Sequence, residues 1–164
     1  MKFEEVREVL IKYLFISDKI QNSILDVGCG RGYGSYCLAP FHIEVVGVDP
    51  VIENIRWAKD HLRNENLSFS QMNYNEIHKL DIFDAVILLD TGKKFFEKDL
   101  YYKYLYYLFD KCVRFGGKLV FDYSSENEQE VKNKFMTQMP QQFPEHNIMV
   151  LNKDFNNKLR GIRL

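Results

Sequence analysis

The feature that most constrains this chain is a run of glycines directly after an apolar segment, in residues 24–34 (ILDVGCGRGYG). Glycine occupies every second position, at Gly28, Gly30, Gly32 and Gly34. This spacing predicts a strand-to-helix turn, because glycine tolerates positive φ and lets another molecule approach the main chain. A phosphate, a dinucleotide and an adenosyl-amino acid are all ligands that could bind against a main chain without side chains. A tight turn without a ligand is the remaining interpretation.

Apolar strands and amphipathic helices alternate along the rest of the chain. Five alternations before a closing hairpin predict an α/β fold, with a mostly parallel sheet and helices on both faces. The expected helices are 3–16, from the glycines to about 39, 52–63, 96–113 and 125–139, with a short helical turn after the third strand. The expected strands are 23–27, 43–49, 67–71, 83–90 and 116–123, and the hairpin pairs 147–152 with 158–164.

Length and composition indicate one domain over residues 1–164, because domains of about 100–150 residues are the commonest. Its parts are an N-terminal helix (1–16), a core (23–123) and a C-terminal helix and hairpin (124–164).

The composition also limits the classes of partner. A net charge of −1 without a basic stripe argues against strong nucleic-acid binding, although it does not exclude a local contact with RNA. No apolar run approaches the roughly 20 residues that cross a bilayer, so we expect no membrane contact. Three cysteines without a CxxC pair suit reduced thiols and a cytoplasmic location.

The tyrosine-rich segment YYKYLYYLF belongs to the expected helix 96–113. Tyr101, Tyr104 and Leu108 share one helical face, which favours packing in the core. Tyr102 and Tyr106 project elsewhere, so we expect them at the surface or in a subunit contact. A homodimer is therefore one possible assembly.

Polar side chains follow the predicted strands at the points where these strands end. Asp49, Asn73, Asp90 and Asp122 occupy these positions after four of the strands. The carboxyl ends of parallel strands meet at one edge of the sheet, where ligands bind at the reversal of strand order. We therefore expect these four residues and the glycine turn to line one cleft.

The glycine spacing discriminates between the candidate ligands. The dinucleotide fingerprint requires a third glycine three residues after the second, and Tyr33 stands there. A phosphate loop is also excluded, because no Gly-Lys-Ser/Thr follows. The spacing present is D-x-G-x-G-x-G, beginning at Asp26.

Several stretches resemble the class I S-adenosylmethionine-dependent methyltransferases. ILDVGCGRG resembles their first motif, VVGVDP the acidic end of their second strand, and FDAVILL and FGGKLVF their fourth and fifth strands. The resemblance covers residues 23–123. It implies a three-layer, Rossmann-like methyltransferase fold with a mostly parallel seven-stranded sheet and an antiparallel C-terminal strand. It also implies S-adenosylmethionine as cofactor and methyl transfer to an unidentified acceptor, which we expect to be a small molecule.

The resemblance places a cofactor site on ten residues. Asp26 is expected to accept backbone N–H bonds from the glycine loop, and Asp49 to accept the ribose hydroxyls through charge-assisted bonds. Asn73 stands where the family often has Asp and can still accept from the adenine amino group. Taken singly, Asp26 could brace the loop and Asp49 could stabilise a helix N-terminus. The expected cofactor residues are Asp26, Gly28, Cys29, Gly30, Gly32, Asp49, Pro50, Asn73, Tyr74 and Asp90.

The acceptor side carries no such signature, and no residue is identified as a catalytic base. The side chains expected nearest the acceptor are Tyr33, Asp90, Thr91, Lys93 and Tyr123. FDAVILLDTGKK and LVFDY also resemble the metal-dependent, catechol-type O-methyltransferases, with Asp90 and Asp122 matching two metal ligands. Tyr123 replaces the expected Asn, so we predict no metal. The alternative to an enzyme is a non-catalytic module of the same fold that binds the cofactor or a partner.

Overall fold

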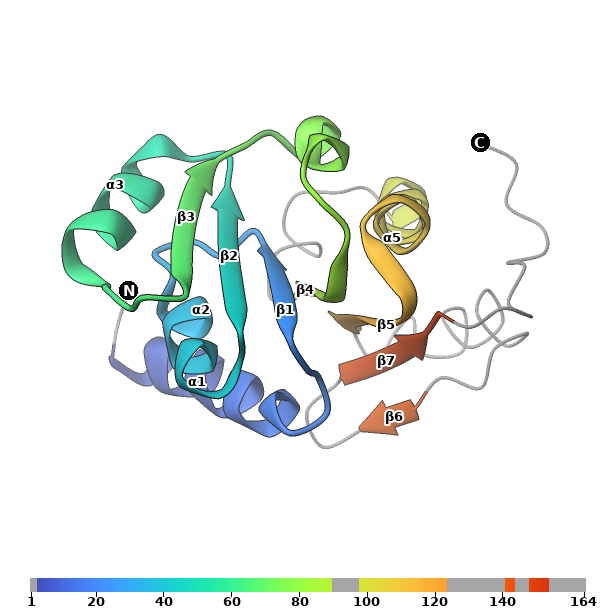
Figure 1. Cartoon of the computed structure of the whole chain (residues 1–164), viewed down its shortest axis with the longest axis horizontal. Coiled ribbons are helices and arrows are strands. Elements are labelled where there is room, and N and C mark those ends of the chain that lie inside the picture. The colour runs from blue at the N-terminus through green and yellow to red at the C-terminus, as the bar shows by residue number, and fades with distance from the viewer. Residues whose placement is uncertain (1–2, 90–97, 124–140, 144–147, 154–164) are drawn as a thin grey trace.

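A seven-stranded sheet lies at the centre of the computed structural model, which describes residues 3–89, 98–123, 141–143 and 148–153 (Figure 1). The strand order is β3-β2-β1-β4-β5-β7-β6, and β7 is antiparallel to both of its neighbours. The order reverses between β1 and β4, which are parallel neighbours. The predicted fold class is confirmed. The strands are β1 (Ser23–Val27), β2 (Glu44–Asp49), β3 (Leu67–Gln71), β4 (Phe83–Leu88), β5 (Val113–Asp122), β6 (Gln141–Phe143) and β7 (Ile148–Asn152).

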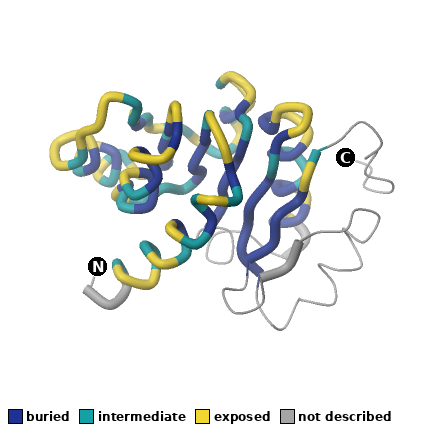
Figure 2. Tube along the Cα trace, turned by 60° about the horizontal axis from the view of Figure 1, so that its bottom comes forward, coloured by how far each residue is buried: buried dark blue, intermediate teal, exposed yellow. Residues whose placement is uncertain are grey.

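Two hydrophobic cores cover the two faces of this sheet. Successive strand residues point to opposite faces, so Ile24 packs in one core and Leu25 in the other. The first core receives α1 (Phe3–Ser17) and α2 (Tyr33–Leu38), and α3 (Ile52–His61) packs on Phe69 of β3. The second core receives the 3₁₀ helix η2 (Tyr74–Lys79) and α5 (Lys98–Lys111). The strands are accordingly the most buried part of the trace in Figure 2, as expected of a sheet covered on both faces.

The tyrosine-rich helix α5 packs more deeply than its sequence predicts. Tyr102 is only 2% exposed and contacts the second core, so its expected surface position is wrong. More than one face of this helix meets the core, since Tyr101 and its neighbour Tyr102 are both buried there. Their ring centroids lie 5.9 Å apart. Tyr106 is half-buried. The homodimer stays a prediction.

The C-terminal hairpin differs from the expected pairing. The strand expected at 147–152 exists as β7, but it pairs with β5 on one side and β6 on the other. The expected partner strand, 158–164, and the expected helix, 125–139, lie outside the described residues. Strand β6 was not predicted, because three residues are too few to show an alternating pattern.

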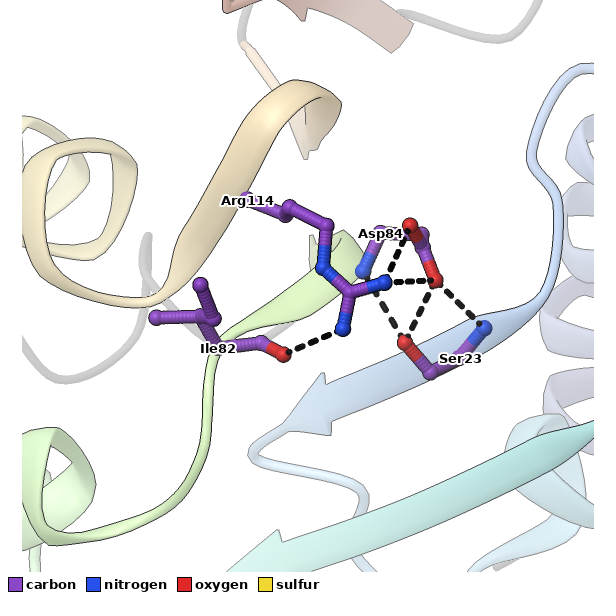
Figure 3. A network of polar contacts seen from close by, with 4 residues as sticks. All are labelled: Ser23, Ile82, Asp84 and Arg114. Carbon is purple, nitrogen blue, oxygen red and sulfur yellow. Dashed lines mark hydrogen bonds and ion pairs between the residues drawn. The ribbon is translucent and has the colours of Figure 1, made fainter.

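A polar cluster joins three strands at their amino ends, opposite the candidate site (Figure 3). Ser23 Oγ donates to Asp84 Oδ2 at 2.7 Å, and the Asp84 backbone N–H donates back to Ser23 Oγ at 3.1 Å. Arg114 donates to the same carboxylate at 3.1 Å and to the Ile82 carbonyl at 3.5 Å. These bonds connect the starts of β1, β4 and β5, so they hold the register that aligns the opposite strand ends.

Across the described part of the chain, no helix is long and apolar enough to span a membrane.

Candidate functional site

The glycine turn leaves β1 in a backbone conformation that side chains disfavour. Gly28, Gly30 and Gly32 have φ values of 73°, 56° and 79°, all in the left-handed region. The N–H groups of Gly28 and Cys29 donate to the Val48 carbonyl at 2.8 and 3.0 Å, which ties the turn to β2. The turn therefore lies between the carboxyl ends of β1 and β2.

The glycines serve two different purposes. A Cβ atom on Gly32 would lie 2.5 Å from the Phe69 ring, and one on Gly34 would lie 2.4 Å from the Tyr13 ring. Both glycines are thus required by packing. A Cβ on Gly30, in contrast, would meet no atom of the described residues within 4 Å. The open side of the loop is at Gly30, and this is where a ligand can approach the main chain.

Asp49, at the end of β2, holds the loop at this open position. Its Oδ2 accepts the Gly30 N–H at 3.0 Å, and its Oδ1 accepts the Val51 N–H at 2.9 Å and Asn54 Nδ2 at 3.2 Å. The residue is 6% exposed. A carboxylate offers about four lone-pair positions, so one remains for a ligand hydroxyl. Displacing the longest bond, from Asn54, frees a second.

Asp26 makes different bonds from those expected. Its carboxylate accepts Tyr13 Oη at 2.7 Å and Ser35 Oγ at 2.5 Å, not the N–H groups of the glycine loop. Within β1 it shares the face of Ile24, so its side chain points between α1 and α2 rather than over the sheet edge. It is fully buried, and this desolvation raises its pKa to about 6 although both hydroxyls oppose the rise. The expected role in bracing the loop belongs to Asp49.

Cys29 is a neutral thiol beside these two carboxylates. Burial raises its pKa well above the ordinary value, and the negative charges of Asp26 and Asp49 raise it further. Its Sγ lies 3.6 Å from the Gly30 carbonyl, as a weak donor. The site therefore combines two acidic groups with a thiol that stays protonated.

The expected adenine side is formed by residues after β2 and β3. Asn73 Nδ2 donates to Glu76 Oε2 at 3.1 Å, which leaves the amide oxygen of Asn73 as an acceptor for an amino group. Burial and the negative charge of Asp49 raise the pKa of Tyr74 to about 12. The Pro50 carbonyl accepts Gln71 Nε2 at 3.2 Å.

The acceptor side is described only in part. Asp90, Thr91 and Lys93 lie outside the described residues. Tyr123 is 2% exposed, at the carboxyl end of β5. Tyr33 lies against α3, with its ring centroid 5.0 Å from that of Trp57.

The metal ligands expected from the catechol-type resemblance are also described only in part. Asp122 is fully buried, and its backbone carbonyl accepts Tyr101 Oη at 2.9 Å. Within the described ranges, no group of three or more His, Cys, Asp or Glu residues could hold a metal ion.

Sequence reasoning missed Tyr13 and Ser35 as residues of the site. Tyr13 lies on the buried face of α1, and its spacing predicts only a core position. Ser35 lies in the first turn of α2 without any motif. Their link to Asp26 depends on how α1 and α2 dock on β1, and no local sequence signal reports that docking.

The strand order, with its reversal beside a glycine turn and an acidic residue after β2, defines a Rossmann-like domain of the methyltransferase type. The comparison with known families agrees: residues 18–160 match the family described as "Methyltransferase domain". The chain belongs to this family.

Individual relatives are similar to this chain over part of its sequence or in fold. A 71-residue segment is 37% identical to the mitochondrial ubiquinone biosynthesis O-methyltransferase of Bos taurus, covering 39% of this chain and 19% of that protein. The N-methyltransferase NodS from Bradyrhizobium japonicum WM9 is similar in structure, with a TM-score of 0.70, 15% identity, and coverage of 90% of this chain and 96% of NodS. A second NodS structure, in complex with S-adenosyl-L-homocysteine, has a TM-score of 0.64 and 16% identity, and the match covers 89% and 85% of the two chains.

Proposed function

We propose that this protein is an S-adenosylmethionine-dependent methyltransferase that acts on a small-molecule acceptor. The observation that carries the proposal is the pairing of Gly30 with Asp49. The main chain at Gly30 is open to a ligand, and its N–H donates to Asp49 Oδ2 at 3.0 Å. The Asp49 carboxylate also keeps one acceptor position that no hydrogen bond uses. The family membership and the likeness to NodS, which is described with S-adenosyl-L-homocysteine, support the same ligand.

The residues present fit this cofactor group by group. Asp49 would accept the ribose hydroxyls, since one acceptor position is unused and the Asn54 bond is replaceable. The free amide oxygen of Asn73 would accept the adenine amino group. Val51 is 44% exposed and offers apolar surface to one face of the base. Gly30 would let the methionine portion lie against the main chain.

Methyl transfer makes modest demands on the protein. The bound sulfonium would supply an activated methyl group: the acceptor atom would bond to the methyl carbon in line as the sulfur–methyl bond breaks and S-adenosylhomocysteine leaves. The protein then contributes mainly by orienting the two partners and excluding water. A base is needed only for an acceptor that must lose a proton. A methyltransferase can therefore act without a dedicated base, which agrees with a sequence in which cofactor residues are recognisable but no catalytic base is.

Calorimetry with S-adenosylmethionine and S-adenosylhomocysteine tests the cofactor assignment. We expect both to bind the wild-type protein, and Asp49→Asn to weaken both by about tenfold to a hundredfold, because charge-assisted bonds contribute about 1.5–3 kcal/mol each. Asp60→Asn, on the exposed surface of α3, is the matched control. Circular dichroism of each variant checks that it is folded. Absence of binding to the folded wild-type protein would refute the proposal.

Labelled-methyl transfer to a cell extract tests the reaction itself. We expect the label to appear in the small-molecule fraction. Label in protein or nucleic acid would contradict the proposed acceptor class. Cofactor binding without any transfer would instead favour the non-catalytic binding module.

We also propose a cytoplasmic location. Cys29, Cys37 and Cys112 are all free thiols, as is usual in reducing compartments. Quantifying free thiols in protein isolated under alkylating conditions tests this, and an oxidised thiol population would contradict it.

A further inference from the structure

The outer face of α5 exposes apolar side chains where a surface helix normally carries polar ones. Leu100 is 53% exposed, and Tyr106 and Tyr107 are half-buried. Lys103 and Asp110 are exposed on the same side of the helix, because positions 100, 103, 107 and 110 follow one another at spacings of three and four residues. We call these five residues the outer stripe of α5. The stripe combines apolar surface with one charge of each sign.

A groove of about 440 Å³ runs beside the outer stripe, between α5 and η2. Tyr74 and His78 of η2 and Tyr104 and Tyr107 of α5 are among its walls. The His78 backbone N–H donates to Tyr107 Oη at 3.1 Å, and Tyr104 Oη donates to the Tyr74 carbonyl at 3.3 Å. Since both of these hydroxyls are engaged, the groove offers mainly ring surface. Covering such a surface with another apolar surface is favourable.

The two charged residues of the stripe differ in their ion pairs. Asp110 forms an exposed pair with the adjacent Lys111 at 2.9 Å, and a pair of this kind contributes little. Lys103 forms no ion pair with any residue that the structure describes. Tyr106 and Tyr107 lie midway between the two charges along the helix. The stripe therefore has a positive charge on one side of its tyrosines and a negative charge on the other.

We propose that this face is a homodimer interface, in which α5 packs antiparallel on α5 of a second copy. A two-fold axis beside Tyr106 and Tyr107 brings Lys103 of each copy opposite Asp110 of the other, because positions 103 and 110 are equally far from this point. Two ion pairs then form together, and Tyr106 of each copy lies against Tyr107 of the other. A parallel arrangement would place Lys103 opposite Lys103 and Asp110 opposite Asp110, so charge repulsion selects the antiparallel one.

The proposed interface lies beside the candidate cofactor site. Tyr74 lines the groove and is also one of the expected cofactor residues. The second copy would therefore cover the surface next to the expected adenine side. One pair of helices with a groove is at the low end of interface sizes, below about 1,200 Å². We accordingly expect a weak dimer, with a dissociation constant on the order of 10–100 μM.

Sedimentation equilibrium of the cofactor-free protein, between about 1 and 300 μM, tests the interface. We expect the mean mass of the wild-type protein to rise with concentration from that of one chain towards that of two. Lys103→Glu and Asp110→Lys each place like charges opposite one another at both contacts, so each should weaken association by about tenfold to a hundredfold. Lys59→Glu and Asp60→Lys make the same charge changes on exposed α3 and should leave association unchanged.

Two combinations of these variants should restore the dimer. The double variant Lys103→Glu/Asp110→Lys exchanges the two charges within each copy, so opposite charges meet again at both contacts. An equimolar mixture of the two single variants has the same complementarity in its heterodimers. Circular dichroism of each variant checks that it is folded.

Three results would overturn the proposed interface. The first is a wild-type protein that stays monomeric at 300 μM, and the second is a dimer that neither charge reversal weakens. The third is a loss of dimer in the single variants that neither combination restores. No cofactor is present in these measurements, so their outcome is independent of whether the protein transfers methyl groups.

Discussion

Replacing Asp26 by Asn should increase the free energy of unfolding at neutral and higher pH, and it removes one negative charge beside the glycine turn. The pKa of Asp26 rises from its usual 3.8 to about 6 because the residue is fully buried. That rise corresponds to about 3 kcal/mol, since one pKa unit is about 1.4 kcal/mol. The folded pKa lies above the unfolded one, so the neutral form favours folding, and this advantage is lost as the pH rises through 6.

The amide of Asp26→Asn is neutral at every pH and avoids this cost, but it accepts less well from two hydroxyl donors. Allowing about 1 kcal/mol for the poorer hydrogen bonds, we expect the free energy of unfolding at pH 8 to increase by about 2 kcal/mol. The gain should shrink towards zero at pH 4.5, where Asp26 is itself largely protonated.

Urea titrations followed by the fluorescence of the single tryptophan, Trp57, measure this difference. Comparing variant and wild type at each pH isolates Asp26, because all other titrating groups are common to both. Asp60→Asn on exposed α3 controls for the loss of a surface carboxylate and should show no such pH dependence. A variant less stable than the wild type at pH 8, or a gap equal at both pH values, would refute the reasoning.

Three further substitutions test the packing around the site. Gly34→Ala places a methyl group against the Tyr13 ring and should lower the free energy of unfolding by about 1–3 kcal/mol in the same titration. Gly30→Ala meets no described atom, so it should cost about 1 kcal/mol through its positive φ. It should nevertheless weaken S-adenosylmethionine binding about tenfold in calorimetry, since it overpacks the open side of the loop. Lys153→Met removes three bonds to carbonyls around the end of α5 and should cost about 2 kcal/mol, seen as a lower melting temperature.

The glycine turn was predictable because its requirement is local. Four glycines after an apolar strand predict a turn with positive φ values. Three of them, Gly28, Gly30 and Gly32, have a positive φ in the structure. The parallel strands were predictable for a similar reason, since runs of apolar residues suit strands covered on both faces. The short strand β6 was not, because three residues carry too little pattern to distinguish it.

The roles of the two acidic residues could not be assigned in advance. The sequence shows Asp26 and Asp49 at the ends of adjacent strands, but not the faces towards which their side chains point. The structure turns Asp26 inward to Tyr13 and Ser35, and gives the loop N–H of Gly30 to Asp49. One residue of displacement along a strand exchanges the two faces, so such an assignment depends on register.

The sequence by itself determined the order of the first five strands and the place of the glycine turn, because these depend on local periodicity and glycine spacing, and the resemblance of its motifs indicated the family. Only the tertiary structure decided which charges are buried and which groups hold them. Tyr13 reaches Asp26 across 13 positions of the chain, and Lys153 reaches Phe109, near the end of α5, across 44 positions. Burial and hydrogen bonding at such distances arise from the docking of whole elements, and no short stretch of sequence encodes that docking.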